Sequence, residues 1–172
     1  MPSGKNHDRI TLWTFPWIVG GALILTRDGE LTLIVASAFL FSGLMFGPDL
    51  DIYSIQFKGW GILRYFWLPY QKIFRHRSWF SHGLIIGTVI RVVYLLSILI
   101  ILSTFLVAIA QLILGFDWNW QIFTLQSFNL LKQEYTQEAI ALFCGLEVGA
   151  MSHSLSDWLS SIYKQRQKKK KS

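Results

Sequence analysis

Residues 84–114 carry a single charged side chain, Arg91, and this stretch limits the fold more than any other part of the sequence. About 20 apolar residues, with a range of about 17–25, are enough for a helix to cross the hydrocarbon layer of a membrane. A helix over 84–114 is therefore long enough to cross a bilayer and to tilt or extend beyond it. A soluble domain of 172 residues is not normally 52% apolar, so the composition favours the membrane class.

Three further stretches qualify as membrane spans: 11–26, 31–48 and 138–159. The first is short and contains Pro16, and the last is interrupted by Glu147, His153 and Asp157. We predict an all-α membrane protein with four transmembrane helices. A single membrane domain, 1–163, is expected to precede a basic cytoplasmic tail, 164–172.

Lysine and arginine residues are distributed unevenly between the loops. Cytoplasmic loops of membrane proteins carry an excess of these residues. If both termini are cytoplasmic, that side holds Lys5, Arg9, Lys58, Arg64, Lys72, Arg75, Arg77 and the six basic residues of 164–171, whereas the other side holds only Arg27 and Lys132. The count predicts a multi-pass protein of the cell (inner) membrane with both termini in the cytoplasm.

The segment between the second and third predicted spans is rich in aromatic and basic residues. Its aromatic residues are Tyr53, Phe57, Trp60, Tyr65, Phe66, Trp67, Tyr70 and Phe74. Aromatic side chains mixed with lysine and arginine suit the headgroup layer of a membrane. We predict an interfacial amphipathic segment there, made of one or two short helices and broken at Pro69.

The basic tail indicates one kind of partner. A run of lysine and arginine beside a membrane helix, without interleaved aromatic residues, is typical of an anchor for anionic lipid headgroups. We therefore expect membrane lipid as a partner and no nucleic acid. The single cysteine, Cys144, excludes an internal disulfide and a cysteine-rich zinc cage.

Histidine and aspartate residues gather at one end of the predicted spans. The four clusters are His7 with Asp8, Asp49 with Asp51, His76 with His82, and His153 with Asp157. All four lie at the cytoplasmic ends of the spans, and the orientation was assigned from lysine and arginine alone. The convergence is therefore independent of the charge count and predicts one shared polar site.

The residue types in these clusters are those that bind divalent metals. Imidazole and carboxylate groups bind Zn²⁺, Mn²⁺ or Fe²⁺ without cysteine. Seven candidate ligands are available: His7, Asp49, Asp51, His76, His82, His153 and Asp157. Seven exceed one tetrahedral site, so we expect one or two divalent ions, with zinc preferred over manganese or iron.

The motifs "HD", "PDLD", "HRSWFSHG" and "SHSLSD" together resemble the YdjM-like family of membrane-bound, predicted metal-dependent hydrolases. The resemblance covers the chain from about Ser3 to Ser160 and is nearest to a branch of uncharacterised metal-binding proteins. It implies a hydrolase site with the same seven ligands and a distant similarity to zinc phospholipase C enzymes. Trp79 and Gly83 depart from the usual central motif, although neither change removes a ligand.

Other polar residues near the clusters suggest roles in catalysis. Asp8 could serve as a general base or support a ligand. Arg75 and Arg77 could hold an anionic substrate group through charge-assisted hydrogen bonds, or could only set the orientation in the membrane. Arg91 and Glu147 lie at similar depth in their spans, so we predict that they form an intramembrane ion pair.

Three functional hypotheses follow. The first is a membrane-embedded metal-dependent hydrolase that acts at the cytoplasmic face on a phosphodiester or another lipid-like substrate. The second is a non-catalytic metal-binding membrane protein for sensing, scaffolding or transport. The third is an interaction protein whose basic tail binds an acidic partner or nucleic acid.

Overall fold

The computed structural model describes residues 4–76 and 78–171, and it describes their side chains except for those of 4–6, 157, 159–161 and 163–171. Every regular element in the described ranges is helical. In chain order these are α1 (Gly4–Thr26), α2 (Gly29–Leu44), η1 (Pro48–Asp51), α3 (Ile55–Gly59), η2 (Gly61–Trp67), α4 (Leu68–Ile73), α5 (Trp79–His82), α6 (Ile86–Leu114), α7 (Trp120–Gln133) and α8 (Thr136–Lys171). The predicted all-α class is confirmed.

Four helical stretches are long and apolar enough to cross a membrane: His7–Thr26, Gly29–Asp51, Ile86–Leu114 and Thr136–Ser156. They correspond to the four predicted spans. The helices themselves extend beyond some predicted bounds. Helix α1 begins seven residues before position 11, α2 and α8 each begin two residues early, and α8 continues to Lys171, past position 159 and into the basic tail.

Helices α2 and α8 form the closest helix pair in the molecule, and glycine makes this approach possible. A Cβ atom at Gly145 would lie 2.5 Å from the carbonyl oxygen of Val35, and one at Gly149 would lie 2.6 Å from that of Phe39. Small residues four positions apart allow two helix backbones to approach closely. The buried Ser42 hydroxyl then donates a hydrogen bond of 2.6 Å to the Leu146 carbonyl of α8.

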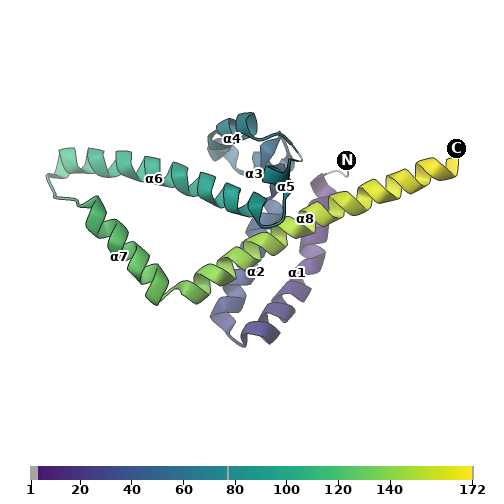
Figure 1. Cartoon of the computed structure of the whole chain (residues 1–172), viewed down its shortest axis with the longest axis horizontal. Helices are drawn as coiled ribbons and strands as arrows, with labels where there is room; N and C mark the ends of the chain where they lie inside the picture. The colour runs from purple at the N-terminus through teal and green to yellow at the C-terminus, as the bar shows by residue number, and fades with distance from the viewer. Residues whose placement is uncertain (1–3, 77, 172) are drawn as a thin grey trace.

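Helix α2 follows α1 after a tight turn and runs back along it. The carboxylate of Asp28 accepts hydrogen bonds from the backbone N–H groups of Glu30 and Leu31, and so caps the start of α2. As Figure 1 shows, α1 and α2 form a hairpin that α8 crosses, whereas α6 extends away from it and α7 leads back to α8.

The aromatic segment between α2 and α6 forms short helices, as predicted. These helices, α3, η2 and α4, fold over the end of α2, and Phe57, Trp67 and Tyr70 are buried in the main apolar core with Phe46 and Leu50. Other rings of the segment, those of Tyr53, Tyr65 and Phe66, are exposed, and its location at a membrane interface stays a prediction. The predicted break lies beside Pro69, where η2 ends and α4 begins.

Pro69 lies in the first turn of α4, where the missing N–H has no helical partner to lose. Close to it, burial raises the pKa of Tyr70 to about 12. The Tyr70 hydroxyl is therefore protonated at neutral pH.

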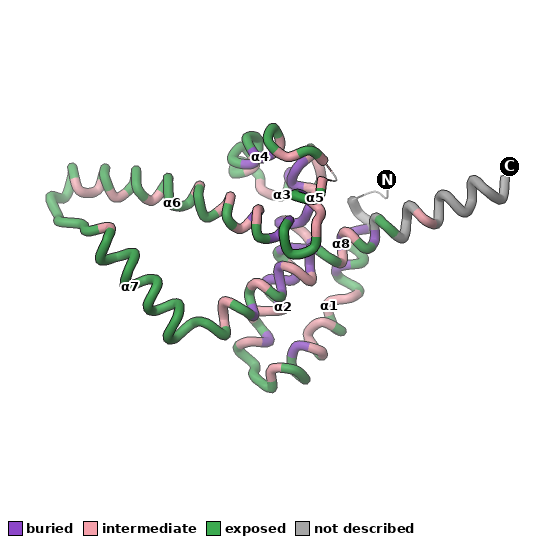
Figure 2. The backbone as a smooth tube through the Cα atoms, in the orientation of Figure 1, coloured by how far each residue is buried: buried purple, intermediate pink, exposed green. Residues whose placement is uncertain are grey.

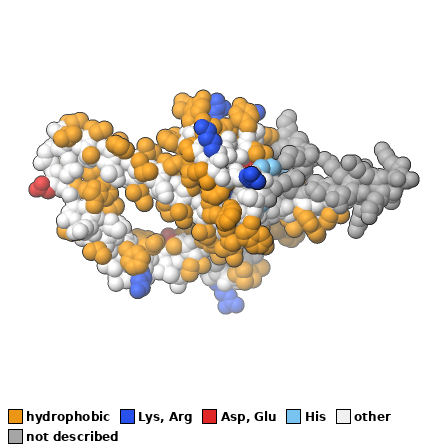
Figure 3. Space-filling view, turned by 45° about the horizontal axis from the view of Figure 1, so that its top comes forward, with side chains coloured by type: hydrophobic (Ala, Val, Ile, Leu, Met, Phe, Trp, Pro, Cys, Tyr) orange, Lys and Arg blue, Asp and Glu red, His pale blue; other side chains and the backbone are white. Residues whose placement is uncertain are grey.

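Helices α6 and α7 contribute little to the core. None of the described α7 residues is buried, and along α6 burial is confined to Gly87, Thr88 and Arg91 near its start. Figure 2 shows buried residues concentrated where α2, α8 and the short helices meet, with α6 and α7 largely exposed. Hydrophobic side chains cover much of the face seen in Figure 3. A surface this apolar suits a lipid environment more than water.

Candidate metal-binding site

Two short turns carry most of the candidate ligands. Gly47 and Pro48 follow the end of α2, and the 3-10 turn η1 that Pro48 begins holds Asp49 and Asp51. In the second turn, the Ser78 side chain accepts a hydrogen bond from the backbone N–H of Ser81 and caps α5, which ends at His82. The contact between these turns brings residues about 30 positions apart into one cluster.

Asp49, His76 and His82 form the compact centre of this cluster. Each offers one ligand atom, and these three atoms all lie within 4.8 Å of one another. The side chains are partly buried and not fully exposed. Two imidazoles and a carboxylate around a common point are a donor set typical of Zn²⁺, Mn²⁺ or Fe²⁺ sites.

Asp51 lies directly behind His76. Its fully buried carboxylate oxygen Oδ1 is 2.9 Å from His76 Nδ1. A carboxylate in this position accepts the Nδ1–H proton, which leaves the lone pair of Nε2 available for a metal. The geometry thus gives Asp51 the part of an orienting residue for His76.

His82 is held in a similar way. Its Nδ1 lies 2.9 Å from the Ser81 hydroxyl and 3.7 Å from Asp51 Oδ2. Asp51 and the Ser81 hydroxyl can both accept an Nδ1–H proton, while the single hydroxyl hydrogen of Ser81 is directed to the Arg75 or the Ser78 carbonyl, each 3.3 Å away. His82 Nε2 is then the free nitrogen, and it lies 3.7 Å from Asp49 Oδ1.

His153 approaches the cluster from α8, on the far side of Asp49. Its Nε2 is 3.2 Å from Asp49 Oδ2. Gln56 donates a hydrogen bond of 2.9 Å to the Gly43 carbonyl, and the same amide nitrogen lies 3.5 Å from His153 Nδ1. His153 Nε2 is buried beside Asp49 and has no hydrogen-bond partner among the described residues, so His153 remains a candidate ligand as well as a neighbour that could orient Asp49.

Gln56 is a site residue that the sequence did not indicate. An amide is not a typical ligand for these metals, and its role depends on a carbonyl of α2 and a ring of α8. Ser156, three positions after His153, could have been found from helical spacing.

The remaining predicted site residues are placed as follows. His7 is buried, and its ring stacks on that of His153 with centroids 4.1 Å apart. The Ser156 hydroxyl makes a short hydrogen bond to His7 Nδ1. Asp8 is half-buried, and no hydrogen bond or ion pair joins it to another described site residue. The side chain of Asp157 and the whole of Arg77 lie outside the described part of the chain.

The prediction of a direct Arg91–Glu147 ion pair is wrong. Both side chains are described, and no ion pair within 4.0 Å joins them. Arg91, 1% exposed, donates a 3.0 Å hydrogen bond to the Ser81 carbonyl and one of 2.9 Å to Thr88 Oγ1. Glu147 instead accepts a 2.9 Å hydrogen bond from the backbone N–H of Ile85.

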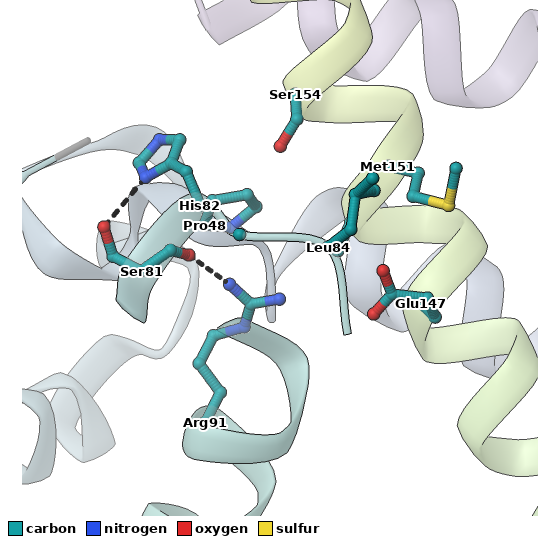
Figure 4. Close-up of a pocket in the computed structure, with 10 residues that line it drawn as sticks. Pro48, Ser81, His82, Leu84, Arg91, Glu147, Met151 and Ser154 are labelled. Carbon is teal, nitrogen blue, oxygen red and sulfur yellow. Dashed lines mark hydrogen bonds between the residues drawn. The ribbon is translucent and has the colours of Figure 1, made fainter. Parts of the chain in front are cut away.

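These two residues brace the turn that carries His82. Both line a cavity of about 10 Å³, with room for no more than one water molecule (Figure 4). Between their contacts, Ile85 has φ 64° and ψ −56°, the rare γ-turn with positive φ, and the Ile86 N–H bonds back to the Leu84 carbonyl at 2.6 Å. Such a backbone persists only where the surrounding structure holds it, and here Arg91 and Glu147 hold its two sides.

The cluster fits a metal ion on one further observation. Among the described side chains, the buried polar atoms without a hydrogen-bond partner include five of this cluster: Asp49 Oδ1, Asp51 Oδ2, His76 Nε2, His82 Nε2 and His153 Nε2. Unsatisfied buried polar atoms cost free energy, and their concentration in this cluster is explained if a cation binds there. These atoms include the nitrogens that Asp51 and Ser81 leave free.

The fold and the cluster define an all-helical protein with four candidate membrane-spanning helices and a histidine–aspartate site suited to a metal. A comparison with protein families matches residues 2–167 to the family described as uncharacterized metal-binding protein (DUF2227). The chain belongs to this family, which covers nearly its whole length. No curated protein and no solved structure matches the chain.

Proposed function

We propose that the chain is a membrane-embedded, metal-dependent hydrolase that acts at the cytoplasmic face on a phosphodiester or ester of an amphiphilic molecule. The observation that carries the proposal is the group of Asp49, His76 and His82, whose buried, unpaired atoms converge on one point. Membership of a metal-binding family supports the metal, and the YdjM-like resemblance supports hydrolysis.

The metal would be held by Asp49, His76 and His82. When bound, a divalent metal lowers the pKa of a water molecule and polarises a phosphoryl or carbonyl oxygen. The chain's own residues prepare the site for it: Asp51 and Ser81 fix the tautomers of the two histidines, and His153 lies against Asp49, which it can orient or join as a ligand.

Charged residues beside the cluster suit an anionic substrate. Arg75 is exposed next to His76 in the chain, so its guanidinium is available to an anionic group. The same role for Arg77, and a general-base role for Asp8, are proposed from the sequence. The apolar exterior of α6 supports placing this site at the surface of a bilayer.

The test is hydrolysis by purified, metal-loaded protein of p-nitrophenyl phosphodiesters and p-nitrophenyl acyl esters. We expect turnover of one class, reduced by more than about 100-fold in His82→Ala, because losing an outer partner of a metal ligand alone costs about 10–100-fold. Asp117→Asn, an exposed aspartate far from the site, is the matched control and should keep full activity. Stoichiometric metal without turnover of either class would contradict the hydrolase and leave metal binding.

A further inference from the structure

Two apolar grooves lie along the surface between α1 and α8, and each has a volume of about 480 Å³. The first is lined mainly by Trp17, Gly21, Leu25, Val35, Ile140 and Cys144. The second is lined mainly by Thr14, Phe39, Leu84, Met151, Leu155 and Trp158. Ile18 and Val148 line both grooves, so the two join end to end.

The grooves exist because α1 and α8 meet at only one end. There, the His7 ring stacks on His153 and bonds to Ser156. Away from this contact, both helices pack on α2 but diverge from each other (Figure 1). At Gly20 and Gly21 a Cβ atom would meet no described atom within 4 Å beyond its chain neighbours and the nearby backbone of α1, so these two positions face open space.

The second groove ends beside the candidate metal-binding site. Leu84, Met151 and Ser154 line this groove and also the small cavity that His82, Arg91 and Glu147 line. Figure 4 shows Leu84, Met151 and Ser154 on the side of that cavity that faces α8. The two grooves and the small cavity therefore adjoin one another, from between the candidate spans to the histidine–aspartate cluster.

The lining of the two grooves matches an amphiphile. None of the described residues that line either groove is charged, and the polar ones gather at its ends. Thr14, Ser152 and Ser154 line the groove nearer the site, and Thr26 and Gln137 line the other. A long apolar middle with a polar end next to a metal-binding cluster suits a hydrocarbon chain with a polar head.

The size of the grooves suits a narrow apolar occupant. The two grooves provide about 480 Å³ each, and both are open to the surroundings along the surface. A single hydrocarbon chain fits this space.

We propose that the two adjoining grooves bind one acyl chain of a membrane lipid and leave the lipid headgroup beside the histidine–aspartate cluster. The direction of the headgroup rests on the proposed function, but binding of the chain does not. The substrate of the site is then an amphiphile with a single chain in the groove. It enters sideways from the bilayer, between α1 and α8.

The test uses a lysophosphatidylcholine that carries a diazirine at the end of its acyl chain, with the full-length protein in phosphatidylcholine nanodiscs. After illumination, mass spectrometry locates the cross-links. We expect them to concentrate on the groove-lining parts of α1 and α8, around Gly21 and Cys144. Gly21→Phe fills the groove and should lose these cross-links, whereas Gly20→Phe, on the exposed neighbouring position, should keep them.

Two results would contradict the binding of an acyl chain in the groove. Cross-links spread evenly over α6 and the groove in the wild type would mean ordinary surrounding lipid only. Equal cross-linking of Gly21→Phe and Gly20→Phe would do the same. If Gly21→Phe does not purify as a folded protein, Cys144→Phe fills the same groove from α8 and is judged by the same criterion.

The same experiment separates this inference from the proposed function. His82→Ala should abolish metal binding and hydrolysis but keep the groove cross-links. Groove cross-links in a wild type that shows no hydrolysis would refute the hydrolase and leave the lipid groove standing. Hydrolysis of short soluble esters without groove cross-links would refute the groove and leave the hydrolase standing.

Discussion

At the scale of single residues, the predicted ligands divide into different roles. Asp49, His76 and His82 converge on one point, whereas Asp51 and His153 each lie against a member of that group. Neighbours that fix the tautomer of a histidine ligand are a general feature of metal sites. Asp49, His76 and His82 therefore form the centre of the proposed site, and the other predicted ligands stay predictions.

The role of Asp51 can be tested with Asp51→Asn, which keeps the size of the side chain but removes its charge. We expect metal affinity to fall by about 10–100-fold, because the variant holds His76 less firmly. Competition with a coloured chelator measures the affinity, and Asp117→Asn is the control. Unchanged affinity would contradict the orienting role, and complete loss of metal would make Asp51 a direct ligand.

Much of the site could be predicted from the sequence because histidine and aspartate are rare in apolar segments. The four clusters therefore stood out, and topology placed them at one end. The contributions of Gln56 and the Ser81 hydroxyl could not be predicted in this way. They depend on the Gly43 carbonyl and on the local turn, which only the folded backbone brings into reach.

At the scale of elements, the turn that joins α5 to α6 is the part of the site that most needs support. Its strained residue Ile85 lies three positions after His82. Arg91 holds the turn from α6, and Glu147 holds it from α8. Residue spacing predicted that Arg91 and Glu147 lie at equal depth in their spans. It could not predict that backbone groups of the α5–α6 turn lie between the two side chains.

Substitutions of Arg91 and Glu147, which hold the turn between α5 and α6, should have graded effects on metal affinity. Glu147→Gln keeps an oxygen that accepts from Ile85 and should change metal affinity little, whereas Glu147→Leu and Arg91→Met should weaken it by about tenfold. Arg91→Met leaves the buried Ser81 carbonyl without its donor, which costs about 1–3 kcal/mol, and Glu147→Leu removes the acceptor that holds the Ile85 N–H. Chelator competition measures the metal affinity. Equal affinities in all three variants would contradict the claim that Arg91 and Glu147 hold the turn.

The α2–α8 contact is the element-scale determinant of stability. Gly145→Val places side-chain atoms against the Val35 carbonyl, and overpacking of this kind costs about 1–3 kcal/mol. We expect a lower midpoint of thermal unfolding in detergent. Gly20→Val, where the added side chain meets open space, is the matched control. An equal midpoint for both variants would contradict the close packing of these helices.

At the scale of the whole molecule, the exposed apolar helices indicate what surrounds the protein. Helix α6 is the most apolar of the four candidate spans and the least buried. Its exposed side chains would be costly in water and are favourable in lipid. The lysine and arginine distribution then predicts which side of the membrane carries the site.

This orientation can be tested in a Cys144→Ser background with single introduced cysteines. Lys72→Cys lies on the predicted cytoplasmic side, and Asp117→Cys lies on the opposite side; both positions are exposed. We expect a membrane-impermeant maleimide to label Asp117→Cys in spheroplasts, and to label Lys72→Cys only after the membrane is permeabilised. Labelling of Lys72→Cys in intact spheroplasts would reverse the proposed topology.

The most direct test of the account is the metal content of the purified protein. Inductively coupled plasma mass spectrometry is applied to the wild type, His76→Ala, His82→Ala and the control Asp117→Asn, all purified in detergent without chelators. The account predicts a stoichiometric divalent metal in the wild type and the control, and its loss in both histidine variants. The same trace amount of metal in all four proteins would contradict it.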